Sequence, residues 1–339
     1  MRQSVKHDLV THYREHARDL PWRIAPGGNE KPDPYRIWLS EVMLQQTTVA
    51  TVGPRFRSFV ERWPTVESLA ESPVEDLLAA WAGLGYYARA RNLHACAVRV
   101  AARGGFPDTE AALRELPGIG DYTAAAIAAI AFGRDAVVVD TNVERVVARL
   151  IALDRPVREE KALIRDEAAK LYDGMDAGTV AQALMDLGAT ICRPRDPRCS
   201  ECPLRAHCAA FATGTPAAFP PRPARKDRPD RHGTAWWIER DGAIFLVRRP
   251  GRGMLGGMAA LPGSDWHDGP LPPTDAPSIV HGFTHFTLAL AIEPRAEPDA
   301  GAEGWWQPLD RLDEAGLPTL YKKAIAAMQA AHPRLPLTP

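Results

Sequence analysis

Two different spacings of hydrophobic residues divide the chain. From about residue 4 to residue 190, apolar residues recur every three or four positions, which places them on one face of a helix. After residue 231 they recur at every second position, which is typical of strands with one buried face. The order predicts a helical N-terminal part followed by a part that contains strands.

The helical spacing is clearest in four segments, separated by short loops rich in proline, glycine and aspartate. They are VEDLLAAWAGL (74–84), NLHACAVRVAA (92–102), YTAAAIAAIAF (122–132) and VERVVARLIAL (143–153). The longest uninterrupted apolar run, nine residues at 124–132, is far shorter than the roughly 20 residues that span a bilayer. We therefore expect a bundle of many short helices and no transmembrane segment.

The second part begins after a proline-rich stretch. Residues 214–231 contain five prolines without apolar periodicity, which indicates an extended connector. Beyond it, TAWWIER and AIFLVRR flank an Asp-Gly pair typical of a hairpin turn, HFTLALAI predicts another strand, and LPTLYKKAIAAMQAA returns to helical spacing. We predict a helical domain at 1–213, a linker at 214–231 and an α+β domain at 232–339.

Length and composition agree with two domains and add one local feature. The 339 residues exceed one ordinary core, and 45% hydrophobic with 24% charged residues is typical of a globular protein. The net charge of −1 gives no sign of a nucleic-acid partner, but residues 192–231 hold nine Lys or Arg against four Asp or Glu. Such a segment either attracts phosphate or forms a solvated linker. The N-terminus shows neither a secretory signal nor a transit peptide, so a cytoplasmic location is expected.

Four of the five cysteines lie within 17 residues. Cys192, Cys199, Cys202 and Cys208 form a C-x6-C-x2-C-x5-C array. In a cytosolic chain such a cluster indicates a metal centre before disulfides, and four thiolates suit either zinc or an iron-sulfur cluster. The first gap of six residues exceeds the usual spacing of zinc sites and favours [4Fe-4S]. Cys96, on a helical apolar pattern, is expected to be buried.

Several motifs together resemble the helix-hairpin-helix DNA glycosylase superfamily and, within it, the adenine DNA glycosylases (MutY). They are SEVMLQQT (40–47), GLGYYARARNLH (83–94), LPGIGDYTA (116–124), VDTNVERV (139–146) and MDLGATIC (185–192), with the four-cysteine loop. The resemblance covers nearly all of residues 1–210. It implies two helical subdomains with DNA between them, a [4Fe-4S] cluster and a monomeric bacterial protein that acts at the nucleoid.

The turn LPGIG precedes one of the helices. Glycine is needed where a backbone adopts positive φ or approaches a ligand closely, and Gly118 and Gly120 suit such a turn. Amides at the start of the following helix can hold a DNA phosphate, although the same pattern alone more often marks a simple helix start. In the endonuclease III branch, a lysine at the position of Tyr122 forms a Schiff base with the sugar. The tyrosine therefore predicts a monofunctional glycosylase that leaves the strand intact.

The resemblance also assigns the chemistry of base removal. A base inside a duplex must be flipped out before it is cleaved, and its departure needs a proton together with stabilisation of an oxocarbenium-like sugar. Glu41 would protonate N7 of adenine from an apolar pocket, and Asp140 would remain ionised beneath the sugar. Tyr122 and Asn142 would orient these groups. Without the resemblance, Glu41 reads as a polar helix residue and Asp140 as a helix N-cap.

Further residues match those by which the family holds DNA. Arg23 and Gln182 lie where family members contact the flipped adenine. Gln46 and Tyr86 correspond to side chains that wedge into the base stack, and Thr47 and Leu84 to those that touch the base left behind. Taken alone, Tyr86 would be a core aromatic.

The C-terminal part resembles the Nudix-like domain by which this family recognises 8-oxoguanine opposite adenine. The matching segments are FLVRRPGRGMLGGMAALPG (245–263) and GWWQPLDRLDEAGLPTLYKKAI (304–325). The glutamate-rich metal box of a Nudix hydrolase is missing after Gly263, so the domain is expected to recognise a base without hydrolysing nucleotides. The family's Phe-Ser-His loop corresponds to Phe283, Thr284 and His285, with threonine in place of serine.

The sequence thus predicts a glycosylase that removes adenine opposite 8-oxoguanine or guanine. One alternative is a related glycosylase for thymine or uracil opposite guanine, against which the C-terminal domain argues. Another is a non-catalytic iron-sulfur protein that only binds DNA, which would need neither Glu41 nor Asp140.

Overall fold

Two compact units make up the protein. The computed structural model describes residues 2–28, 30–81, 83–221, 227–250 and 253–332. Their contacts group residues 1–73 with 91–224, and residues 74–90 with 225–339. The first unit is helical, and the second holds every strand of the described residues. The predicted fold class, mostly α followed by α+β, is confirmed.

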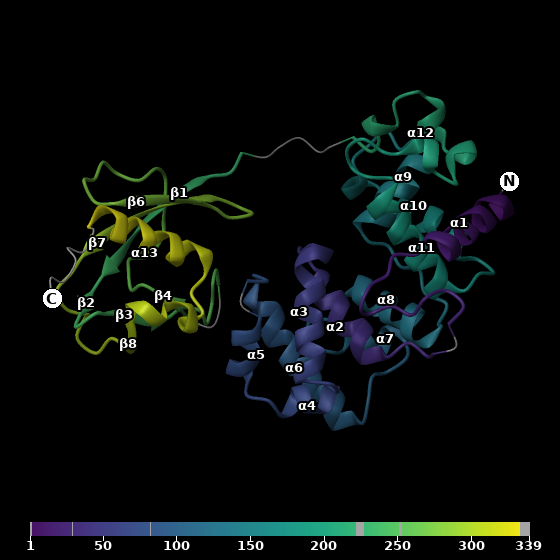
Figure 1. The fold of residues 1–339 in the computed structure, drawn as a ribbon. Helices are drawn as coiled ribbons and strands as arrows, with labels where there is room; N and C mark the ends of the chain where they lie inside the picture. Colours follow the sequence, from purple (N-terminus) through teal and green to yellow (C-terminus); the bar gives the residue numbers. More distant parts are fainter. Residues whose placement is uncertain (1, 29, 82, 222–226, 251–252, 333–339) are drawn as a thin grey trace, which may run out of the picture. The chain divides into compact units, whose positions relative to one another are not determined.

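Short helices build the first unit. They are α1 (Arg2–His16), α2 (Pro34–Leu44), α3 (Val49–Arg62), α4 (Val66–Glu71), most of α6 (Tyr87–Arg103), α7 (Glu110–Arg114), α8 (Asp121–Phe132), α9 (Thr141–Leu150), α10 (Lys161–Tyr172), α11 (Ala177–Thr190) and α12 (Ala209–Ala212). Helix α1, at the start of the chain, lies beside α10 and α11, far from it in sequence (Figure 1).

Helix α8 forms the centre of this unit. Its residues 123–130 are all buried, because it packs against α2, α7 and α11. A helix that is apolar on all sides is stable only where it is surrounded. It ends at Gly133, whose φ of 61° is left-handed. The apolar run at 124–132 is therefore a core helix, and its fixed position also fixes the residues at its N-terminus.

The second unit contains two four-stranded sheets. Its elements are α5 (Val74–Ala80), β1 (Asp230–Trp237), β2 (Glu239–Arg240), β3 (Ala243–Arg248), β4 (Ala259–Ala260), β5 (His267–Asp268), β6 (Ser278–Gly282), β7 (Thr287–Pro294), β8 (Gly304–Pro308) and α13 (Thr319–Ala331). One sheet has the order β5-β1-β7-β6 with β1 and β7 parallel, and in the other β3 pairs with β2, β4 and β8. Helix α13 packs on β6 and β7 (Figure 1).

The hairpin, strand and helix predictions for this unit are confirmed. Asp241 and Gly242 both have positive φ, at 49° and 74°, as a two-residue turn between β2 and β3 requires. Strand β1 begins at Asp230, so it takes the last two residues of the predicted linker. Residues 222–226 of that linker lie outside the described residues. The strands β4, β5, β6 and β8 were not predicted, because they are short or lack alternating apolar residues.

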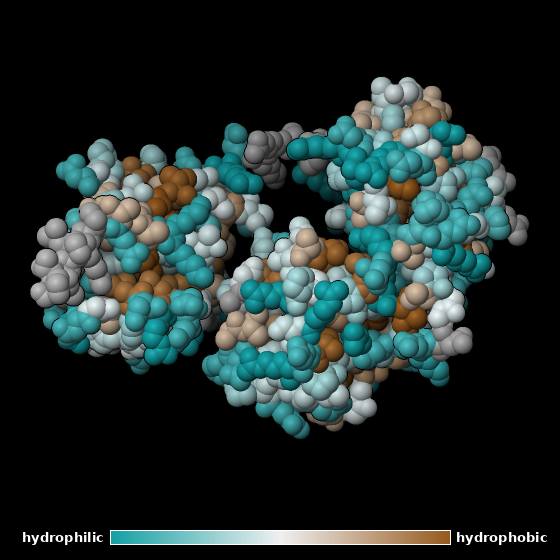
Figure 2. Space-filling model, in the orientation of Figure 1, coloured by the Kyte–Doolittle hydropathy of each residue, from teal (hydrophilic) through white to brown (hydrophobic). Residues whose placement is uncertain are grey.

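The faces drawn in Figure 2 are mainly polar, with small and separate apolar patches on each unit. Within the described part of the chain, no helix combines the length and hydrophobicity needed to cross a bilayer.

Candidate active site and cluster loop

A cleft of about 810 Å³ opens in the first unit between α2, α8, α9, α11 and the loop that precedes α2. It brings together eight of the residues named from the sequence, which are Arg23, Glu41, Gln46, Thr47, Tyr122, Asp140, Asn142 and Gln182. They come from segments up to 159 positions apart (182 − 23). The fold therefore creates one site from residues that the sequence only lists separately.

Glu41 is the buried acid of this cleft. It lies on α2, whose start is capped by Asp33 and pre-set by Pro34, and its exposed fraction is 7%. Burial raises the pKa of Glu41 to about 7, Tyr122 lowers it through a hydrogen bond, the charge of Asp140 raises it, and that of Arg23 lowers it. A carboxyl group with this pKa can be protonated near neutral pH and can give up its proton there.

Tyr122, on α8, makes a hydrogen bond to the carboxyl group of Glu41. Its hydroxyl donates to Oε2 of Glu41 at 2.5 Å, which leaves Oε1 free to carry a proton. Burial, followed by the charges of Glu41 and Asp140, raises the pKa of Tyr122 well above its ordinary value. The phenol is therefore a neutral hydrogen-bond donor with a fixed role in orienting Glu41.

Asp140 caps α9 and also faces the cleft. Its Oδ1 accepts from the backbone N–H of Val143 and its Oδ2 from the Nδ2 of Asn142, each at 2.7 Å. Asn142 is fixed in turn by Arg145, which donates to its Oδ1 at 2.7 Å. Asp140 is therefore the N-cap and also lines the cleft, so the capping interpretation does not exclude the predicted catalytic role.

Arg145 also connects this region to the cysteine loop. Its guanidinium donates to the backbone oxygens of Gly188 and Cys192 at 2.8 and 2.7 Å. The sequence did not single out this residue, since an arginine on an amphipathic helix is ordinarily solvated.

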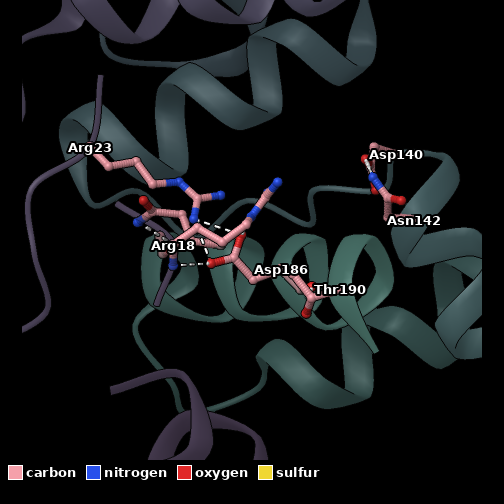
Figure 3. Close-up of polar contacts among 8 residues, drawn as sticks. Arg18, Arg23, Asp140, Asn142, Asp186 and Thr190 are labelled. Atoms are coloured by element: carbon pink, nitrogen blue, oxygen red, sulfur yellow. Dashed lines mark hydrogen bonds and ion pairs between the residues drawn. The ribbon is translucent and has the colours of Figure 1, made fainter. Parts of the chain in front are cut away.

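An ion-pair cluster forms the wall of the cleft beside α11. Arg23 donates through Nη1 to both oxygens of Asp186 at 2.7 Å, and Arg18 donates to the same carboxylate through Nε and its backbone N–H, as Figure 3 shows. Gln182 lies one turn earlier on α11 and donates to the backbone oxygen of Gly178. Arg18 and Asp186 were not predicted. The sequence did contain a sign of Asp186, because it is a charged residue among the mainly apolar positions of MDLGATIC.

The turn between α7 and α8 holds the two glycines that were predicted to bind a phosphate. Gly118 has a φ of 76°, and a Cβ there would lie 2.8 Å from the Cβ of Asn92. Gly120 is the N-cap of α8 with a φ of −92° and open space where a Cβ would point. The positive φ predicted for this turn occurs at Gly118. Gly120 does not have it, but its small size leaves room in front of the helix N-terminus.

The two residues predicted to wedge into a base stack are exposed. Gln46 follows α2 with a φ of 57°, and Thr47 donates a backbone hydrogen bond to Leu44 beside it. Tyr86 has a φ of 49° and an exposed fraction of 53%, which excludes a core role. An exposed aromatic in a strained backbone conformation is typical of a functional loop. Leu84, two residues earlier, is buried.

The four clustered cysteines line one small cavity, together with Arg149 and Phe211. None of the four forms a disulfide, and burial is the main cause that raises the pKa of Cys202 to about 11. Arg149, with an exposed fraction of 2%, donates to Sγ of Cys192 at 3.3 Å and to the backbone oxygen of Arg193. Among the described residues, no group of three or more His, Cys, Asp or Glu side chains already has the positions of metal ligands. Cys96 is buried, as expected.

In the second unit, Phe283, Thr284 and His285 occupy the loop between β6 and β7. The backbone N–H of Phe283 donates to the oxygen of Phe286 at 2.9 Å and closes this loop. Thr284 and His285 are exposed, whereas the ring of Phe283 packs among Trp266, His281 and Phe286. The Phe therefore anchors the loop, and the two polar residues are displayed.

Comparison with known proteins identifies the class to which this fold and site belong. Residues 39–171 match the HhH-GPD superfamily of base excision DNA repair proteins, and residues 234–327 match the NUDIX domain. A thermostable thymine-DNA glycosylase is similar in structure, with a TM-score of 0.55 and 30% identity over 62% of this chain and 97% of its own. Endonuclease III in a non-covalent DNA complex has a TM-score of 0.52 and 25% identity, over 63% of this chain and 98% of its own.

Curated relatives define the family more narrowly. The adenine DNA glycosylase of Homo sapiens is 33% identical, over 97% of this chain and 75% of the human protein. That of Mycolicibacterium smegmatis is 43% identical, over 71% of this chain and 82% of its own. The chain therefore belongs to the adenine DNA glycosylase family, whose members are enzymes of base excision repair.

Proposed function

We propose that the protein binds duplex DNA as a monomer, flips out an adenine that lies opposite 8-oxoguanine or guanine, and hydrolyses its N-glycosidic bond. The main support is the pair formed by Glu41 and Tyr122 in a cleft that also holds Asp140. Two carboxylates with different surroundings are what an acid-assisted glycosidic cleavage requires.

In this mechanism the protonated Glu41 gives its proton to N7 of the flipped adenine. The bond between the base and the sugar then breaks with its electron pair on the base, and a positive charge develops on the sugar. The carboxylate of Asp140 accepts hydrogen bonds from Val143 and Asn142, and its negative charge stabilises that cation. Water supplies the hydroxyl that adds to the sugar, and its released proton returns to a carboxylate of the cleft.

The strand remains intact in this proposal. Tyr122 occupies the place at which a lyase would need an amine, and a phenol cannot form a Schiff base with the sugar. The sequence has no lysine between Lys31 and Lys161. The product is an abasic site.

We also propose that Cys192, Cys199, Cys202 and Cys208 hold a [4Fe-4S] cluster. The shared cavity and the four-thiol donor set support it. When bound, such a cluster would fix the loop between α11 and α12, and Arg149 would offset part of the thiolate charge.

One structural neighbour gives the thymine alternative some weight, because it is a thymine-DNA glycosylase at 30% identity. That likeness covers 62% of this chain, however, whereas the human adenine DNA glycosylase is similar over 97%. We therefore favour adenine. In this proposal Thr284 and His285 contact the opposite 8-oxoguanine, and their exposure on the β6–β7 loop supports that role.

Asp140→Asn tests this proposal. The variant keeps a side-chain oxygen for the N-cap but loses the negative charge, so we expect excision of adenine to fall at least about 100-fold. Duplex binding, measured by gel shift, should persist. An unchanged single-turnover rate in the folded variant would contradict the mechanism, and an unchanged rate for Glu41→Gln would do so independently.

A further inference from the structure

Asp186 is a buried carboxylate to which the mechanism gives no task. It lies on α11 with an exposed fraction of 6%, and its two oxygens accept four hydrogen bonds. These come from Arg18 Nε at 2.6 Å, the Arg18 backbone N–H at 3.0 Å, and Arg23 Nη1 at 2.7 Å to each oxygen. Figure 3 shows both arginines converging on it. A buried charge of this kind persists where it is fully paired.

The two arginines belong to the same cleft as the acid. Arg18, Arg23 and Glu41 all line it, and the side chain of Arg23 is almost completely buried against Asp186. The charge of Arg23 lowers the pKa of Glu41, so it favours the ionised form that cannot donate a proton. Without a negative partner, the two guanidinium groups would disfavour protonation of Glu41. They would also repel a base that becomes positively charged.

We propose that Asp186 is a positioning residue for base excision: it fixes Arg18 and Arg23 along the wall of the cleft and offsets one of their two charges. The cluster then carries a net charge of +1 in place of +2. Its arginines can approach a flipped purine, a neutral base with hydrogen-bond acceptors at its edges, without opposing protonation of that base. This inference rests on the proposed function, because it assumes that Glu41 donates the proton.

The other charged and titratable groups around Glu41 are few. Tyr122 faces it from α8, Asp140 from the start of α9, and Arg23 from the loop before α2. Arg18 and Glu144 line the same cleft. Of these groups, Arg18 and Arg23 bind Asp186, so removing its charge should act on Glu41 mainly through the arginines.

Asp186→Asn removes the charge with little change in shape. We expect the single-turnover rate of adenine excision near pH 7 to fall about 10- to 100-fold. The reason is that Arg18 and Arg23, no longer fixed by the carboxylate, would orient the flipped base less well. Glu41 must be protonated, so the rate is lost as pH rises through its pKa. With Arg23 uncompensated, the midpoint of that loss should move to lower pH by about half a unit or more. Affinity for the abasic product duplex should change little.

A second substitution separates charge balance from loss of structure. In Arg18→Met/Asp186→Asn one positive and one negative charge are removed together, so the midpoint should return towards that of the wild-type protein. Thr190→Val is the matched control: its hydroxyl donates to the backbone oxygen of Asp186 at 2.7 Å, and its loss should leave the midpoint unchanged.

The inference would be overturned if folded Asp186→Asn had the same midpoint as the wild-type protein. It would also be overturned if the midpoint of Arg18→Met/Asp186→Asn were no higher than that of Asp186→Asn. Melting temperatures identify the folded variants. If Asp186→Asn does not fold, the same comparison is made between the wild-type protein and Arg18→Met, in which Asp186 opposes Arg23 alone and the midpoint should move to higher pH. Full activity of Glu41→Gln would instead refute the proposed assignment of Glu41 as the acid, on which this inference rests.

Discussion

Glu41 and Asp140 are two carboxylates in one cleft whose surroundings differ. Glu41 is buried, and its carboxyl group receives one hydrogen bond, from a neutral phenol. Asp140 receives two, one from a backbone amide that its own position at the N-cap supplies. Burial favours the neutral form of a carboxyl group and hydrogen-bond donors favour the ionised form. These different environments support the proposed division of roles between the two carboxyl groups.

The pH dependence of excision follows from the pKa of Glu41, which is about 7. Because the proposed mechanism needs the protonated form, the single-turnover rate should be highest below pH 7 and fall as pH rises through it. Rates from pH 5.5 to 9 on a duplex with adenine opposite 8-oxoguanine would measure this. Glu41→Gln should lose at least about 100-fold in rate, and a wild-type rate that rises through pH 7 would contradict the assignment.

At the scale of single residues, the sequence named candidate site residues but not the contacts that surround them. The resemblance pointed to Glu41, Tyr122 and Asp140, but contacts across 81 positions, as between Tyr122 and Glu41, become visible only in the fold. Asp186 was missed for the same reason. Its partners Arg18 and Arg23 lie 168 and 163 positions away, and no local pattern links them.

Among the elements, α8 and the turn before it connect the core to the predicted phosphate-binding site. The buried face of α8 fixes Tyr122 in the cleft, and its N-terminus is open where Gly120 lies. The apolar run predicted the helix, but it did not distinguish the role of Gly118 from that of Gly120, which depends on φ and on the approach of Asn92. The short strands of the second unit were missed because pairing with neighbours, more than their own sequence, defines them.

The two glycines allow a matched test of the phosphate clamp. Gly118→Ala forces a side chain into positive φ against Asn92, so the free energy of unfolding should fall by roughly 1 kcal/mol or more. Gly120→Ala has open space for its methyl group, so its effect on stability should be smaller, while the methyl group obstructs an approaching phosphate. Duplex affinity by fluorescence anisotropy should therefore fall in Gly120→Ala by more than its melting temperature suggests. Unchanged affinity in that variant would argue against a clamp.

The cysteine loop allows a separate prediction. A [4Fe-4S] cluster would make the purified protein brown with broad visible absorption, and Cys199→Ser should weaken that absorption. Iron and sulfide analysis gives the stoichiometry. A colourless protein that contains zinc would show that the other interpretation of the four thiols is the right one.

At the scale of the whole molecule, two units would read the two bases of one mispair. The first unit holds the cleft for the excised base, and the second displays Thr284 and His285 on a loop anchored by Phe283. Residues 264–277, where a hydrolase would need its glutamates, form mainly a loop with the short strand β5. The change in apolar spacing near residue 231 predicted the change from helices to strands. It could not predict which residues of the second unit are displayed, because that depends on the β6–β7 pairing.

The central claim is that the protein excises adenine according to the base opposite it. Duplexes that differ only in one mispair, adenine or thymine opposite 8-oxoguanine or guanine, should be incubated with excess protein, and the released base and the strand should be analysed. We expect free adenine from both adenine mispairs, fastest opposite 8-oxoguanine, with the strand intact until alkali is added. Release of thymine but not adenine would contradict the account.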